Sequence, residues 1–265
     1  MAMQINTNIS ALDAQRTIQK SQAALSKTMQ RLSSGMRINK AADDAAGLGI
    51  SDKFQSQIRQ YQQDSNSLQS GYNMMQTADG GLSQQNNVLA RVRELAVQAT
   101  NGTLTDGQRN SINAEAQQML EEINTTAQNT EFNGQKVLEG VTTTLTSNGQ
   151  SAKIDASNAA TLGIVGVDLS TQAGAQSAID TINSASTKLN ANRTQLGAQM
   201  NKYESSINQL GTSILNATAS DSQIRDADIA QETANMARNQ ILSQASISSM
   251  AMSNFSSQAA LSLLR

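Results

Sequence analysis

A seven-residue apolar repeat dominates the chain between residues 50 and 100. No proline interrupts this stretch, so the pattern predicts one long helix that wraps around an equally long partner. At 1.5 Å per residue the helix would be about 75 Å long, far longer than the helices of ordinary globular domains. The repeat consists of Phe54, Tyr61, Leu68, Met75, Leu82, Leu89 and Ala96.

The second half of the chain carries a matching repeat between about residues 173 and 219. Because the two repeats have similar lengths, we expect them to pair within the chain as an antiparallel coiled coil. The alternative is two separate amphipathic helices in a globular bundle. The second repeat consists of Ile182, Leu189, Leu196, Tyr203, Leu210 and Ala217.

Weaker helical patterns occupy both ends of the chain, at residues 1–33 and about 224–265. Neither apolar stripe is strong enough for an independently stable helix, and an exposed Leu-Leu pair near the end is unfavourable in water. We therefore predict that the ends pack against other copies of the chain. The residues expected to make these self-assembly contacts are Ile5, Ile9, Leu12, Leu25, Leu32, Ile241, Met252, Phe255, Leu261, Leu263, Leu264 and Arg265.

Several polar residues mark the ends of the predicted helices. Ser51 is placed to cap the first long helix, after a flexible turn at Gly47 and Gly49. Asp221 follows a predicted break at residues 220–222, where it would cap the last helix. Thr105 or Asp106 would begin a shorter helix that ends near residue 130 and folds back on the first long helix.

Residues 131–176 change in character, because Thr, Ser, Gly and Asn become frequent. Asn148-Gly149 lies between two β-branched runs, which predicts a hairpin. The predicted fold class is therefore mainly α: a long antiparallel coiled-coil or helical-bundle rod, with paired terminal helices and a small β-hairpin region in the middle. The expected domains are a terminal helix at 1–40, the first half of the rod at 41–176 with the β region at 131–176, the second half at 177–220 and a terminal helix at 221–265.

The composition narrows the function classes. The 265 residues include no Pro, Cys, His or Trp, and aromatic residues make up 2%. Without His and Cys the usual bases, nucleophiles and soft-metal ligands are missing, so we expect no enzyme, no metal and no cofactor. The net charge of −2 indicates neither a nucleic acid nor a membrane as partner. The N-terminus also lacks the basic and apolar regions of a signal peptide.

Asp43 and Asp44 are adjacent carboxylates, which in other settings serve as an acid–base pair. The simpler interpretation is that they are polar residues of a connector and face basic side chains of a neighbour. The glycines near residues 47 and 163 lack the spacing of phosphate-binding loops. No catalytic or cofactor-binding residue is therefore predicted.

Several blocks of the chain resemble bacterial flagellin, and together they cover nearly its whole length. The most specific is LSSGMRINKAADDAAGLGIS at residues 32–51. The others are INTNISALDAQR at 5–16, RVRELAVQ at 91–98, EFNG at 131–134, IRDAD at 224–228 and LSLLR at 261–265.

The resemblance implies a self-assembling subunit of the bacterial flagellar filament, with its terminal helices in the inner core and its coiled coil in the outer tube. It also implies export through the flagellar type III apparatus to the outside of the cell. The partners it implies are further copies of the chain, an export chaperone, the filament cap and the hook–filament junction proteins. The large outer domains of many flagellins have no counterpart here.

Some flagellins are also sensed by a Toll-like receptor of animal hosts. The matching positions in this chain are Arg91, Leu95 and Glu115, while Ala90 stands where receptor-active relatives commonly have Gln. Whether the receptor binds this chain therefore stays open. The same helix surface, including Arg93, also has a structural interpretation as a contact between subunits.

Two rival functions differ from a filament subunit. A hook–filament junction protein would share the terminal helices, but the resemblance to flagellin blocks disfavours it. A cytoplasmic coiled-coil adaptor would explain the heptads, but not the weak apolar ends.

Overall fold

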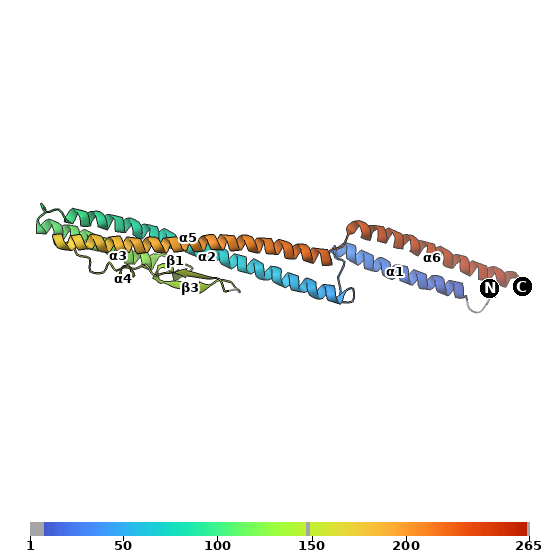
Figure 1. Ribbon diagram of the computed structural model, residues 1–265. Helices are drawn as coiled ribbons and strands as arrows, with labels where there is room; N and C mark the ends of the chain where they lie inside the picture. Colours follow the sequence, from blue (N-terminus) through green and yellow to red (C-terminus); the bar gives the residue numbers. More distant parts are fainter. Residues whose placement is uncertain (1–7, 147–148, 264–265) are drawn as a thin grey trace. The chain divides into compact units, whose positions relative to one another are not determined.

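The computed structural model of the chain describes residues 8–146 and 149–263, with side chains in the last helix through residue 255. The chain forms two compact units. Unit 1 combines the chain up to Ile58 with the chain from Leu215 onward, and unit 2 is Arg59–Ile214. Two long helices, α2 (Ala45–Ala99) and α5 (Gln172–Arg225), contribute residues to both units. Figure 1 shows that they run in opposite directions, as the two heptad repeats predict.

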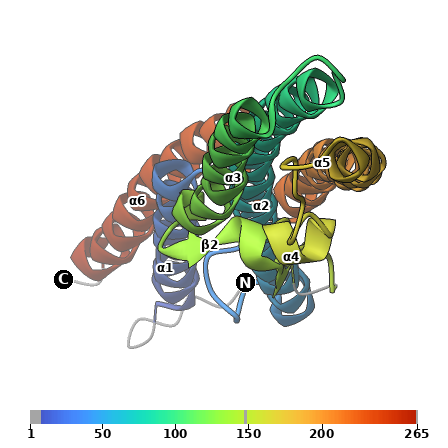
Figure 2. The same cartoon turned by 90° about the vertical axis from the view of Figure 1, so that its left-hand side faces the viewer.

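Unit 2 has its core between α2, α5 and a third helix, α3 (Asp106–Asn129). Figure 2 shows these helices side by side, with the short α4 (Ala159–Leu162) beside them. Thr105 caps α3 through a reciprocal pair of hydrogen bonds with Gln108, which confirms that prediction. Nine heptad residues are buried here: Leu68, Met75, Leu82, Leu89, Ala96, Ile182, Leu189, Leu196 and Tyr203. Three others, Phe54 in unit 1 and Tyr61 and Leu210 in unit 2, are half-buried.

Two small hairpins lie beside the helices of unit 2. The predicted hairpin is present as β3 (Val141–Thr144) and β4 (Ser151–Ile154), with Val141 opposite Ile154. A shorter one, β1 (Glu131–Phe132) and β2 (Gln135–Lys136), was not predicted and is followed by a 3₁₀ turn, η1 (Val137–Glu139). Its turn is Asn133-Gly134, with φ of +52° and +77°, the conformation that an Asn-Gly hairpin favours.

Unit 1 contains the two terminal helices, α1 (Ile9–Ser34) and α6 (Ile229–Leu263), which lie side by side in Figure 1. Asn8 caps α1, and Gly35 ends it with φ of +69°. Backbone hydrogen bonds then join the two chain segments that follow α1 and precede α6. Arg37 N donates to Arg225 O at 2.6 Å, and Ala227 N donates to Gly35 O at 2.9 Å.

The prediction that Ser51 caps α2 is wrong, because the helix begins at Ala45 and contains Gly47 and Gly49. The side chain of Asp44 accepts a hydrogen bond from Gly47 N at 2.9 Å and so caps the first turn. The chain turns earlier, where Asp43 forms an ion pair with Lys27 at 2.6 Å. Hydrogen bonds from Lys27 and from the backbone of the connector lower the pKa of Asp43.

The predicted break at residues 220–222 is also absent, because α5 continues to Arg225. Asp221 lies inside the helix, and its carboxylate accepts hydrogen bonds from Ser51 and Gln55 of α2. The carboxylate of Asp228 instead begins α6, accepting from Ala230 N at 2.9 Å. Asp221 therefore does not cap a helix end, although Asp favours that position, and forms a contact between two helices instead.

Candidate interaction surfaces

The terminal helices α1 and α6 meet along a seam that combines apolar positions with a series of polar side chains. The α6 side of the seam repeats every seven residues at Glu232, Asn239, Ser246 and Ser253. Three of these side chains reach polar partners on α1: Glu232 binds Arg31 at 3.0 Å, Asn239 binds Thr28 at 3.4 Å, and Ser253 binds Asn8 at 3.1 Å. Such contacts fix a register but contribute little net stability.

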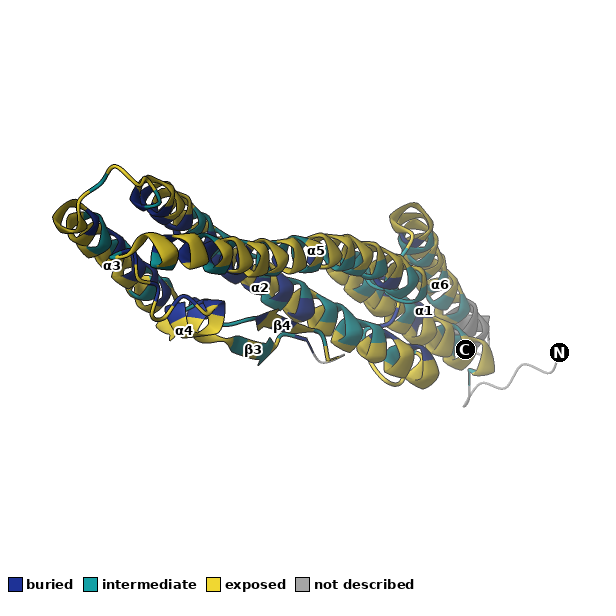
Figure 3. Cartoon of the chain, turned by 60° about the vertical axis from the view of Figure 1, so that its left-hand side comes forward, coloured by how far each residue is buried: buried dark blue, intermediate teal, exposed yellow. Residues whose placement is uncertain are grey.

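Apolar burial between the terminal helices is correspondingly small. The buried residues of α1 are Ile18, Ser21 and Thr28. Within the described side chains of α6, Glu232 is the only buried one. Figure 3 shows the contrast with unit 2, where buried positions gather along α2, α3 and α4. The pair of terminal helices therefore has almost no apolar core of its own.

Large apolar side chains of the terminal helices face solvent instead. The predicted self-assembly residues Ile9, Leu12, Ile241, Met252 and Phe255 are 51–77% exposed. Two others, Leu25 and Leu32, are half-buried. The remaining predictions fall on Ile5, Leu264 and Arg265, which lie outside the described residues, and on Leu261 and Leu263, whose side chains are not described.

The exposed residues of α6 form a stripe opposite its polar seam. Ile241 and Phe255 each follow a seam residue, Asn239 and Ser253, by two positions. At about 100° per residue, two positions turn the side chain by about 200° around the helix. The helix therefore presents Ile241 and Phe255 to solvent, while Met236 and Met250, on the same side as Glu232, are half-buried.

A second surface lies on α2 and α3 in unit 2. The guanidinium of Arg91 binds Glu94 and Glu115, each at 3.0 Å, and all three side chains are largely exposed. The hydrogen bonds that Arg91 donates, first the one to Glu94 and then the one to Glu115, raise the pKa of Arg91. The structure thus brings two of the receptor-matched positions together. Leu95, the third position, is 2% exposed and offers no surface for direct contact.

The open face of α2 beside this cluster consists of Ala90, Arg93, Glu94 and Val97. Val97 is 53% exposed. The sequence pattern identified Arg93 as a candidate contact between subunits, and it lies on this exposed face. The exposure of Val97 follows from its position on the α2 face turned away from the heptad core.

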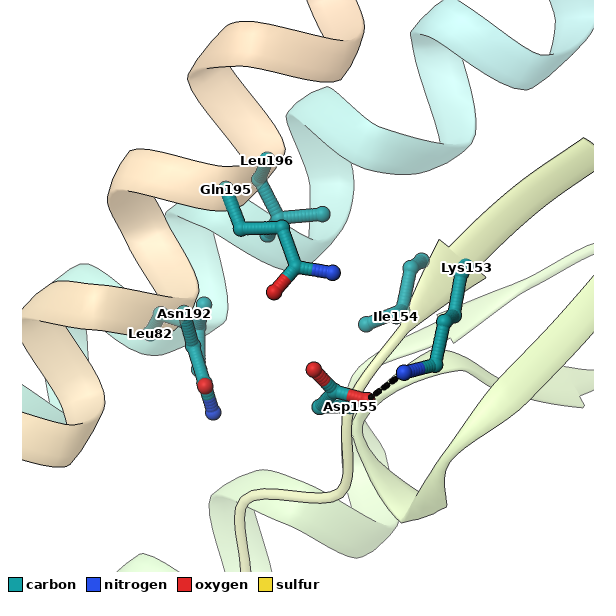
Figure 4. Close-up of a pocket in the computed structure, with 7 residues that line it drawn as sticks. All are labelled: Leu82, Lys153, Ile154, Asp155, Asn192, Gln195 and Leu196. Atoms are coloured by element: carbon teal, nitrogen blue, oxygen red, sulfur yellow. Dashed lines mark ion pairs between the residues drawn. The ribbon is translucent and has the colours of Figure 1, made fainter.

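No feature of the described residues resembles a reaction centre. Figure 4 shows Lys153 and Asp155 of the β region opposite Asn192 and Gln195 of α5, but the space that they line has no room for a water molecule. No group of three metal-binding acidic side chains occurs within the described ranges. No helix there is apolar enough over 18 residues to cross a membrane.

Two family models match most of the chain. Residues 5–143 match the bacterial flagellin N-terminal helical region, and residues 179–264 match the bacterial flagellin C-terminal helical region. The unmatched interval contains most of the β3–β4 hairpin, α4 and the start of α5. The side chains that join α1 to α6, and the exposed faces of these two helices, therefore lie within the two matched regions.

Individual relatives match over their full length. The flagellar filament core protein flaB2 of Brachyspira hyodysenteriae and a flagellin of Halalkalibacterium halodurans are each 38% identical, with 99% of this chain and 100% of each relative covered. A Vibrio parahaemolyticus structure assigned to the flagellar hook-associated proteins matches with a TM-score of 0.55, over 69% of this chain and 100% of its own. At 14% identity, that likeness concerns the fold alone.

Proposed function

The chain belongs to the bacterial flagellin family and is a structural subunit of the flagellar filament, and we propose that its copies join through the exposed faces of α1 and α6. The full-length identity to filament proteins supports the function. The outward apolar stripe of α6 is the single observation that supports the proposed contact. We also infer that the chain carries no catalytic activity, consistent with a family of structural filament proteins.

Covering the stripe would drive polymerisation. Ile241, Met252 and Phe255 are each more than two-thirds exposed in the isolated chain. Removing one such side chain from water contributes about 1.5–3 kcal/mol before the entropy of ordering is subtracted. The polar seam holds α1 and α6 in register, while neighbouring copies supply the apolar cover that the pair lacks.

The assembly would be open-ended. A contact between two different surfaces, repeated from copy to copy without closing a ring, generates a helical filament. The outer faces of α1 and α6 differ from each other in sequence, since α1 offers Ile9 and Leu12 while α6 offers Ile241, Met252 and Phe255. Such dissimilar faces favour a head-to-tail arrangement over a closed dimer.

The remaining partners follow from the family. We propose that the chain is exported in an unfolded form by the flagellar type III apparatus, since α1 and α6 have little core to unfold. An export chaperone would cover the apolar stripe of α6 before assembly. The filament cap and the hook–filament junction proteins would meet the same terminal helices at the two ends of the filament.

The receptor surface is a further proposal. Arg91 and Glu115 are exposed and joined to each other, so a Toll-like receptor of an animal host would meet a preorganised charge pair. Leu95 would act by supporting this pair from the core. Binding of the purified ectodomain to the wild-type chain, compared with Arg91→Ala and with the exposed control Arg59→Ala, tests the proposal; equal binding by all three would contradict it.

Seeded polymerisation followed by negative-stain electron microscopy tests the filament contact. We expect long tubes from the full chain, and none from a truncation that lacks residues 1–33 and 230–265. The sharper comparison is Phe255→Ser against Asn254→Ser, which lie next to each other on the exposed surface of α6. Loss of tubes only with Phe255→Ser supports the stripe, whereas equal polymerisation by both variants contradicts it. Short rings from the full chain would favour a junction protein.

A further inference from the structure

The methionines of this chain differ widely in their exposure to solvent. There are 11 in the sequence, and Met252 and Met29 are the exposed ones among those whose side chains the structure describes, at 77% and 52%. Met74 and Met75, in the core of unit 2, are 4% and 0% exposed. Because a dissolved oxidant approaches from the solvent, the thioether of Met252 is the most accessible of these sulfur atoms.

Met252 lies within the apolar stripe of α6 that the proposed filament contact uses. It follows Ile241 by eleven positions and precedes Phe255 by three. At about 100° per residue, Met252 lies about 20° from Ile241 and about 60° from Phe255 around the helix. The most accessible of these sulfur atoms is therefore also part of a surface that a neighbouring copy would cover.

A peroxide would turn this apolar side chain into a polar one. The sulfur attacks one peroxide oxygen and the O–O bond breaks. The attacked oxygen stays on sulfur as a sulfoxide, and its proton passes to the other oxygen, which leaves as water. Sulfur loses two electrons and the peroxide gains them. The sulfoxide oxygen accepts hydrogen bonds, but Ile241 and Phe255 carry no side-chain donor, so burying it against such a stripe is unfavourable.

The folded subunit should tolerate oxidation at this position. Met252 is mostly in water, so its side chain has few packing contacts to lose. The buried Met74 and Met75 are shielded by the core of unit 2. Oxidation at Met252 therefore acts on the contact between copies and leaves the fold of each copy unchanged.

We propose that Met252 is a redox-sensitive modification site, at which peroxides reversibly block the addition of free subunits to the filament. A methionine sulfoxide reductase would reverse the modification. Subunits already in the filament are protected, because their neighbours cover the sulfur. The inference rests on the proposed assembly through α6 and adds chemical control of that contact.

Peptide mapping by mass spectrometry provides the first measurement. Free subunits and seeded filaments are treated with hydrogen peroxide, quenched and digested. We expect the sulfoxide at Met252 to form several-fold more slowly in filaments than in free subunits, while Met75 stays unmodified in both. Equal rates of oxidation at Met252 in the two samples would overturn the proposal.

The second measurement is the ratio of critical concentrations for polymerisation after and before peroxide treatment of the free subunits. Wild type should show an increase of about tenfold, because a buried apolar contact is lost, and reductase treatment should restore its starting value. Met252→Leu has no sulfur at this position, so its critical concentration should not change with peroxide. Circular dichroism should show the same helical content in every sample.

Met29→Leu is the matched control, because Met29 is the other exposed methionine. It lies about 160° from Ile9 and about 100° from Leu12 around α1, outside the proposed contact face. This variant should therefore respond to peroxide as wild type does. Resistance of Met29→Leu, or an equal response of Met252→Leu and wild type, would overturn the proposal. If untreated Phe255→Ser polymerises normally, the proposed filament contact fails instead.

Discussion

Arg193 of α5 donates two hydrogen bonds to the carboxylate of Asp79 of α2, from Nε at 2.8 Å and from a terminal nitrogen at 3.3 Å. Three heptads further on, directly after the end of α2, Thr100 O accepts a hydrogen bond from Gln172 at 3.0 Å. Gln172 precedes Arg193 by the same 21 residues that separate Asp79 from Thr100. The two helices of unit 2 therefore keep one antiparallel register over this length.

Replacing Arg193 by Gln should weaken unit 2 only slightly. The side chains of Arg193 and Asp79 are 34% and 39% exposed, so solvent screens their attraction and the expected loss is about 0.5–1 kcal/mol. Urea unfolding followed by circular dichroism would measure it, and the loss should shrink in 1 M NaCl. A loss above about 3 kcal/mol, or one unaffected by salt, would show that the pair contributes more than a screened surface contact.

Gln85 should matter far more, because it ties three parts of unit 2 together while fully buried. Its amide nitrogen donates to Ile123 O at 3.1 Å and to Ser157 O at 2.7 Å, and its oxygen accepts from Ser157 Oγ at 2.6 Å. Gln85→Leu would leave Ser157 without these partners, at a cost of about 2–4 kcal/mol.

The neighbouring Gln84 is exposed and provides the control for this substitution. Gln84→Leu should change the urea midpoint by the equivalent of at most about 0.5 kcal/mol. If the two variants unfold at the same urea concentration, the buried hydrogen-bond network does not stabilise unit 2 as argued.

The sequence predicted the parts of the fold that depend on apolar periodicity. Leu82 and Leu189 belong to strict heptads, and both are fully buried. Ser51 and Asp221 were misread because Ser and Asp favour caps in general, whereas these two bind each other across helices. Whether a polar side chain caps its own helix or binds a neighbouring helix depends on tertiary structure.

The candidate surfaces were predicted less completely. Exposure of Phe255 and Met252 was expected, because the apolar positions of the last helix are too sparse for a self-sufficient stripe. The polar seam through Asn239 was missed, since a search for apolar repeats passes over a polar one. Val165 is 73% exposed and could not be separated by sequence from its buried neighbour Ile164, because the two flanking glycines turn it outward through their positive φ angles.

Tyr203 should ionise at a higher pH than an ordinary tyrosine. Its side chain is 1% exposed, and burial raises the pKa of its hydroxyl above the ordinary value of 10.0. The folded state thus holds the proton more tightly than the unfolded state. The free energy of unfolding therefore does not depend on the titration of this group below about pH 10, and it falls as the pH rises from there through the folded-state pKa. Absorbance at 295 nm would follow the titration.

Tyr203→Phe should remove the late-titrating fraction without destabilising the protein. The hydroxyl of Tyr203 has no hydrogen-bond partner within the described residues, so its burial is a cost. We expect a change between zero and about 1 kcal/mol in favour of the variant. Tyr72→Phe, at a half-buried position, is the control. Marked destabilisation by Tyr203→Phe would indicate that the hydroxyl is bonded in solution.

Gly80 and Gly81 are adjacent in α2, yet alanine should have opposite effects at the two positions. A Cβ at Gly80 would have no neighbouring heavy atom within 4 Å, whereas one at Gly81 would lie 2.7 Å from Thr130 Oγ1 and 2.8 Å from Leu138 Cδ1. Gly80→Ala should therefore stabilise the helix by up to about 1 kcal/mol. Gly81→Ala should overpack the contact between α2 and the β region and cost about 1–3 kcal/mol. Urea unfolding of the two variants beside wild type measures both changes in the free energy of unfolding. If both variants were more stable than wild type, Thr130 and Leu138 would have to move aside at little cost.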